Sequence, residues 1–119
     1  MKIVKVVGSA LLVAIFLIGT YAYFKLKENG IIPRRDYDTV APAIPVFDRP
    51  AVLVLNKTNG FVHKEAIPAA DEMLTRIAED NGWDIFITNN AATFSPDILA
   101  RFEVVVWNNV SGDVLTTEQ

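Results

Sequence analysis

Apolar and polar residues follow each other in long blocks along this chain, and the first block is the longest. Residues 6–24 form a run of 19 residues without a formal charge. A helix needs about 20 apolar residues to cross a bilayer, and this run has no polar face that would suit a buried soluble helix. We therefore expect residues 1–27 to be a membrane anchor, with a cleaved signal segment as the alternative.

The hydrophobic pattern disappears between residues 28 and 50. Prolines recur there at four positions: Pro33, Pro42, Pro45 and Pro50. Each proline removes an amide donor and pushes the preceding residue towards extended geometry. The segment is interpreted as a semi-rigid linker of extended chain, in which Val46 and Phe47 are the side chains that could dock on the domain predicted after it.

From residue 51 the pattern alternates between strands and helices. Residues 51–55 form a continuous apolar run, which predicts a strand over residues 51–56 that is buried on both faces of a parallel sheet. Apolar residues at steps of three and four predict a helix over residues 66–81, with Gly82 as its stop signal. Two more strands, at 83–88 and 103–108, enclose a short helix at 97–100. The order βαβαβ predicts an α/β fold with a doubly wound parallel sheet.

The last residues match a helix start. Thr116 and Gln119 fit the capping-box pattern. Three strands within roughly 70 residues are also fewer than a doubly wound sheet needs to cover its faces and edges. We therefore expect residues 51–119 to be the first part of a larger domain, with an incomplete doubly wound sheet.

Composition excludes several kinds of site. The net charge is −3 and the basic residues are scattered, so no nucleic-acid-binding face is expected. Cysteine is absent and histidine occurs once, so these residues offer neither a zinc cluster nor a Cys–His pair. We expect no cofactor and no metal. Positive charges flank the apolar run on both sides: Lys2 and Lys5 before it, and Lys25, Lys27, Arg34 and Arg35 after it. Counting them alone favours a cytoplasmic carboxyl side.

Residues 51–119 resemble the amino-terminal half of the ThuA-like (trehalose utilisation) family in three stretches: VLNKTNGFVHKEAIPA, NGWDIFITNNAATFSPDILARFEVVVWNN and SGDVLTTEQ. The family pattern K-T-x-G-F-R-H is matched by Lys57, Thr58, Gly60, Phe61 and His63, while Val62 stands where arginine is common. The resemblance implies a flavodoxin-like fold related to the class I glutamine amidotransferases. It also implies an extracytoplasmic, periplasmic domain, because many members carry export signals.

The predicted topology places two loops beside each other. In flavodoxin-like sheets a crevice opens beyond the carboxyl ends of the first and third strands, so residues 57–63 and 108–113 should meet there. The candidate ligand-binding residues are Lys57, Thr58, Gly60, Asn108, Asn109, Ser111 and Gly112. Their donors and acceptors suit the hydroxyl groups of a small carbohydrate. As alternatives, Gly60 could serve only the turn, and residues 111–113 could be a loop before a helix.

His63 and Asp113 are the candidate catalytic residues. An imidazole at this position could exchange a proton with bound substrate, and Asp113 could orient the histidine or hold a hydroxyl. His63 could equally cap the helix or fill the crevice wall. The resemblance implies a carbohydrate-processing enzyme, acting by proton transfer or hydrolysis. A non-catalytic sugar-binding or accessory module on a membrane anchor is the alternative.

Other polar and aromatic residues have simpler interpretations. Trp83 and Trp107 could stack on a sugar, but their places in strands favour core packing. Asn89 and Asn90 follow a strand, where an asparagine pair is typical of a turn. Asp71 is expected on or beside the solvent face of the 66–81 helix.

Overall fold

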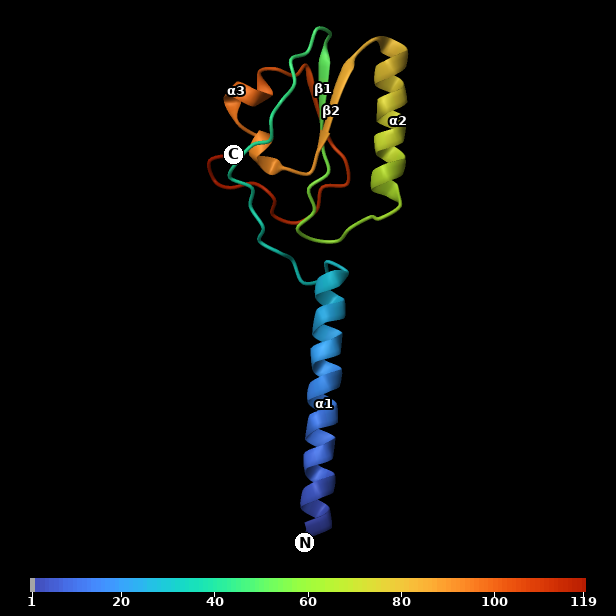
Figure 1. The fold of residues 1–119 in the computed structure, drawn as a ribbon, viewed down its shortest axis with the longest axis vertical. Helices are drawn as coiled ribbons and strands as arrows, with labels where there is room; N and C mark the ends of the chain where they lie inside the picture. The colour runs from blue at the N-terminus through green and yellow to red at the C-terminus, as the bar shows by residue number, and fades with distance from the viewer. Residues whose placement is uncertain (1) are drawn as a thin grey trace.

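The computed structural model describes residues 2–119 and contains a long helix and a small α/β unit (Figure 1). The elements in chain order are α1 (Lys2–Glu28), β1 (Ala51–Leu55), α2 (Ala66–Asn81), β2 (Asp84–Thr88), the 3₁₀ helix η1 (Ala91–Thr93), α3 (Pro96–Leu99) and β3 (Val104–Trp107). The predicted order of strands and helices is confirmed, with boundaries that shift by one residue at several ends.

The helix α1 stands apart from the rest of the chain. From Val6 to Leu26 its large apolar side chains are exposed, and within the described residues Val6–Glu28 is one helix long and apolar enough to cross a membrane. The expectation of a long apolar helix is confirmed. Gly30, with a φ of 69°, lies just after the end of the helix in a left-handed conformation that glycine adopts without strain.

The sheet has the order β2-β1-β3, and both pairs of strands are parallel. Leu53 in the central strand is paired with Phe86 on one side and Val105 on the other. Every residue of β1 is buried, as its unbroken apolar run predicted. In Figure 1, α2 lies on one side of the sheet and α3 on the other. The α/β fold with a parallel sheet is therefore confirmed.

The core lies on the α3 side of the sheet. Leu53, Leu55 and Phe94 form its buried cluster, and six partly buried residues pack against it: Phe86, Leu99, Phe102, Val105, Val110 and Leu115. Because side chains alternate along a strand, Val52 and Val54 point to the other face, where α2 lies. The sheet thus has apolar residues on both faces.

The predictions for Gly82 and Gln119 hold, whereas those for Trp83 and Trp107 are wrong. Gly82 ends α2 with a φ of 67°, and Gln119 Oε1 accepts a hydrogen bond from the Thr116 amide at 2.9 Å. Trp83 and Trp107 are not core residues, because 38% and 49% of their surfaces are exposed. The helix η1 was not predicted. Asn90 caps it through a side-chain bond to the Ala92 amide, so this asparagine begins a helical turn.

Residues 29–50 contain no helix or strand and run along the α/β unit. Near the end of this segment the Phe47 ring lies 5.2 Å from that of Phe102, while Val46 is exposed. Arg49 Nε donates to Asp84 Oδ1 at 2.9 Å, and this hydrogen bond lowers the pKa of the Asp84 carboxyl. The extended segment is therefore attached to the domain by side chains.

Candidate functional site

The carboxyl ends of the three strands point towards the end of α1, so the loops that follow them lie between the sheet and that helix (Figure 1). The loops after β1 and β3 are joined by an isolated parallel bridge between Thr58 and Ser111. The amides of Asn59 and Gly60 both donate to the Ser111 carbonyl, at 2.8 and 3.1 Å. The two loops expected at the crevice therefore meet.

Gly60 and Gly112 lie at the closest approach of these loops. Gly112 has a φ of 76°, and a Cβ on it would lie 2.7 Å from the Gly60 amide nitrogen. A Cβ on Gly60 would lie 3.3 Å from Ser111 Oγ. The Ser111 hydroxyl in turn donates to the Phe61 carbonyl at 2.6 Å. The close packing of the two loops therefore explains why glycine occurs at both positions. Contact of Gly60 and Gly112 with a ligand stays a prediction.

Lys57 is buried, with 8% of its surface exposed, and its amine faces the segment that precedes the domain. Its Nζ lies 2.9 Å from Asp38 Oδ2 and 3.6 Å from Asp36 Oδ2. Asp38 Oδ2 also accepts a hydrogen bond from the Ala91 amide at 2.9 Å. The predicted ligand-binding lysine is thus paired with two carboxylates that lie outside the predicted site loops.

Asn59 was not predicted as a site residue, yet it joins three segments. It is 1% exposed, and its Nδ2 donates to the Asp36 carbonyl at 3.0 Å and to the Asp113 carbonyl at 2.7 Å. Its own carbonyl accepts from the Arg34 amide. The signal that could have found it is a polar residue in the short loop after a fully buried strand, where a side chain needs hydrogen-bond partners inside the protein.

Asp113 and His63 do not contact each other through a hydrogen bond within the described residues. Asp113 Oδ2 accepts from Tyr37 Oη at 2.7 Å, and this bond raises the pKa of Tyr37. His63 is exposed, and its ring lies edge-on to Phe61 at 4.7 Å. The His63 carbonyl accepts from the Ile67 amide, so its backbone contributes to the start of α2. The catalytic roles of both residues stay predictions.

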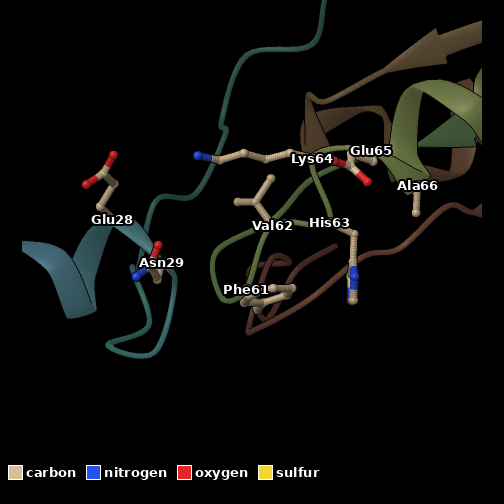
Figure 2. A pocket seen from close by; sticks show the side chains of 8 residues that line it. All are labelled: Glu28, Asn29, Phe61, Val62, His63, Lys64, Glu65 and Ala66. Atoms are coloured by element: carbon tan, nitrogen blue, oxygen red, sulfur yellow. The ribbon is translucent and has the colours of Figure 1, made fainter.

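His63 lines a hollow of about 420 Å³ between the end of α1 and the loop before α2 (Figure 2). Its lining residues are Glu28, Asn29, Phe61, Val62, His63, Lys64, Glu65 and Ala66. In Figure 2 the Lys64 side chain extends towards the α1 end, while the imidazole points away from it. A Cβ on Gly30 would collide with the Gly60 carbonyl, so the chain after α1 packs tightly on this loop.

Asn108 and Asn109 lie at the other end of the predicted site. Asn108 is buried, and its Nδ2 donates to Asp71 Oδ1 at 2.8 Å and to the Ile67 carbonyl at 3.1 Å. Asp71 Oδ2 accepts from Asn56 Nδ2 at 2.7 Å, so the expectation of a solvated Asp71 is wrong. Asn109, with a φ of 54°, donates to Asn108 Oδ1. The side-chain amides of Asn108 and Asn109 thus both donate hydrogen bonds within the protein.

A second hollow, of about 300 Å³, lies where residues 34–38 pass the ends of β1 and β2. It is lined by Arg34, Asp36, Asp38, Asn56, Lys57, Thr58, Asn59 and Asn89. All eight side chains are polar or charged, so the hollow is suited to a polar ligand. In the described part of the chain no group of three or more histidine or acidic side chains could hold a metal ion.

Comparison with known proteins supports one assignment. The family model described as trehalose utilisation, ThuA, matches residues 51–119. No curated protein and no solved structure matches the chain. The matched range begins with β1 and includes every strand of the sheet.

Proposed function

We propose that this chain, which belongs to the ThuA (trehalose utilisation) family, acts in carbohydrate processing at the carboxyl edge of its parallel sheet. The observation that carries the proposal is the junction of the loops after β1 and β3, where Thr58 is bridged to Ser111. Ligand sites of open α/β sheets lie in this position. The polar side chains around the junction supply the paired donors and acceptors that sugar hydroxyls need.

The proposed roles differ between the two halves of the first loop. Lys57 and Thr58 line a polar hollow and bind hydroxyl groups of the sugar. His63 is exposed at the other hollow, beside the end of α1, where an imidazole can accept a proton from the sugar and return it near neutral pH. Asp113, in the loop after β3, holds a hydroxyl group of the sugar. The reaction class is proton transfer or hydrolysis.

A test uses the full-length protein with a fixed panel of trehalose, sucrose, maltose and glucose. We expect His63→Gln to lower turnover about 100-fold or more with little change in melting temperature, because the side chain is exposed. Lys57→Ala should mainly weaken binding. Glu65→Gln, which changes another side chain of the His63 hollow, is the matched control and should retain turnover. Unchanged turnover in His63→Gln would remove its catalytic role.

A non-catalytic sugar-binding module is the second candidate, and one observation favours it. The Asp113 carboxylate accepts from Tyr37 instead of the imidazole, so His63 has no carboxylate to orient it among the described residues. Calorimetric titration with the same panel separates the candidates. Binding of a sugar that is never consumed would support the module, and the absence of binding to every sugar would contradict both.

We further propose that α1 anchors the domain on the outer face of the cytoplasmic membrane. The length and apolar surface of Val6–Glu28 support a membrane location. A phosphatase reporter that works only outside the cytoplasm, fused after Asp48, should be active, and the intact protein should sediment with membranes. Activity of a reporter restricted to the cytoplasm would reverse the orientation, and a shortened soluble product would favour a cleaved signal.

A further inference from the structure

The polar hollow under residues 34–38 is a stronger candidate for the sugar site than the hollow around His63. We propose that it is the binding pocket for one neutral sugar unit, and that Asp36, from the segment before the domain, is a ligand-binding residue that sets specificity. This inference rests on the proposed carbohydrate function and names the site within it. The hollow has a volume of about 300 Å³, which is at the lower end of the range for small-molecule pockets.

The wall formed by residues 34–38 is fixed by contacts with all three strand ends. The Arg34 amide donates to the Asn59 carbonyl after β1. Asp38 Oδ2 accepts from the Ala91 amide after β2, and Tyr37 Oη donates to Asp113 after β3. A wall held at three points can keep a carboxylate in place for a ligand, which lowers the entropy lost on binding.

The charges around the hollow favour a neutral ligand over an ion. Arg34 and Lys57 supply two positive charges, and Asp36 and Asp38 supply two negative ones. A charged ligand would therefore be attracted and repelled by equal numbers of groups. A neutral polyol instead donates its hydroxyl hydrogens to the carboxylates and accepts from the cations, and such charge-assisted hydrogen bonds are the stronger kind.

The acceptors of the hollow have unused capacity. The Asp36 side chain is 77% exposed and is held only at 3.6 Å from Lys57, so its oxygens can accept from a ligand. Asn56 Oδ1 is buried and has no hydrogen-bond partner among the described residues. A buried acceptor without a partner is costly, and this one belongs to a residue that lines the hollow. Asn89, exposed on the β2 side, offers both donors and an acceptor.

The hollow around His63 is less suited to hold a sugar by hydrogen bonds. Phe61, Val62 and Ala66 contribute apolar surface to it, and one side of it is formed by the end of α1. The proposed arrangement therefore separates binding under residues 34–38 from any proton transfer at His63. Residues 34–38 also lie outside the family match of 51–119, so this wall of the hollow comes from outside the matched domain.

The experiment measures dissociation constants for the sugar panel on the full-length protein in detergent. We expect Asp36→Asn and Asn89→Ala, which alter opposite walls of the hollow, each to raise the dissociation constant about tenfold. The control is Asp80→Asn, which removes the same charge from an exposed position in α2 and should leave the constant unchanged. Because Asp36 and Asn89 are exposed, both variants should keep the parent melting temperature.

Each outcome has a separate meaning. If the parent binds a sugar and the two hollow variants bind it as tightly as Asp80→Asn does, the site lies elsewhere and the proposed function survives. Tighter binding by Asp36→Asn would mean that residues 34–38 obstruct the site, which also contradicts the inference. A parent that binds no sugar of the panel contradicts the proposed function itself. Weaker binding by both hollow variants supports the inference.

Discussion

The loop after β1 contains two halves with opposite environments, although the sequence presents them as one motif. Lys57 and Asn59 are buried and bonded to other segments. Further along the loop, Phe61 is 50% exposed and His63 lies at the surface. The first half continues the buried strand and faces residues 34–38, whereas the second half faces the end of α1. A run of matching motif residues can therefore combine a structural anchor with an accessible surface.

The physical reason for the difference is the number of neighbouring segments. A parallel strand delivers its first following residues into the space shared with the adjacent strands, here at the bridge between Thr58 and Ser111. Polar groups that are buried in that space must find protein partners because they are shielded from water. Beyond Gly60 the chain leaves the sheet, and its side chains can be hydrated. The two halves should therefore respond very differently to the same kind of substitution.

The largest expected effect is that of Asn59→Ala. Asn59 Nδ2 holds the carbonyls of Asp36 and Asp113, and its removal leaves both acceptors without this donor. We expect a loss of about 2–4 kcal/mol in the free energy of unfolding, measured by urea denaturation in detergent. Asn81→Ala is the control, since Asn81 also donates to a carbonyl but is exposed. If both variants lost the same free energy of unfolding, burial would not explain the importance of Asn59.

The two lysines of this loop, Lys57 and Lys64, allow a direct comparison of its halves. Lys57→Met leaves the Asp38 carboxylate without its cation at 2.9 Å, which should cost about 1–3 kcal/mol in the free energy of unfolding. Lys64→Met removes the same charge from the exposed half and should change that free energy by less than about 0.5 kcal/mol. Thermal and urea unfolding of both variants provide the measurement. A Lys64 effect as large as that of Lys57 would show that the outer half is also structurally coupled.

The sequence predicted the elements of the sheet more completely than the site. Apolar runs identify β1 and β3, and the steps of three and four together with Gly82 identify α2, because burial and helix ending are local properties. The partners of Lys57 were missed because Asp36 and Asp38 come from a segment without hydrophobic periodicity. One signal was present: in an extended chain, residues two apart point to the same side, so this pair could have indicated a common partner.

The exposed tryptophans show a second limit of sequence analysis. Trp107 belongs to β3, which was correctly predicted as a strand, but β3 pairs only with β1 in the described sheet. The burial of Trp107 therefore depends on which segments lie beside β3 and which pack on its faces. An apolar run does not specify either. The same limit applies to the hollows, because each is formed by segments far apart in the sequence, such as α1 with the loop at 61–66.

A smaller effect is expected for alanine substitutions at two glycines with positive φ. They separate the cost of backbone strain from that of a steric collision. Gly112→Ala would place a Cβ 2.7 Å from the Gly60 nitrogen, at a φ of 76°. Gly82→Ala meets a similar φ of 67° with no atom within 4 Å. We expect Gly82→Ala to cost about 1 kcal/mol from backbone strain alone and Gly112→Ala to cost about 1 kcal/mol more from the collision. Equal melting temperatures would mean that the two loops separate easily.

The smallest effect concerns the bond between Tyr37 and Asp113, through which residues 34–38 contact the second loop. The hydrogen bond to Asp113 is the main cause of the raised Tyr37 pKa, and burial and the Asp113 charge add to it. Because the folded pKa lies above the unfolded value of about 10, the neutral phenol stabilises the fold below that pH. This stabilisation is lost as the pH rises through the folded pKa. The phenolate absorbance of the parent minus that of Tyr37→Phe should therefore titrate above the ordinary tyrosine range. Asp113→Asn should return it towards that range. A difference spectrum that titrates at the ordinary value in the parent would mean that residues 34–38 do not hold this contact in solution.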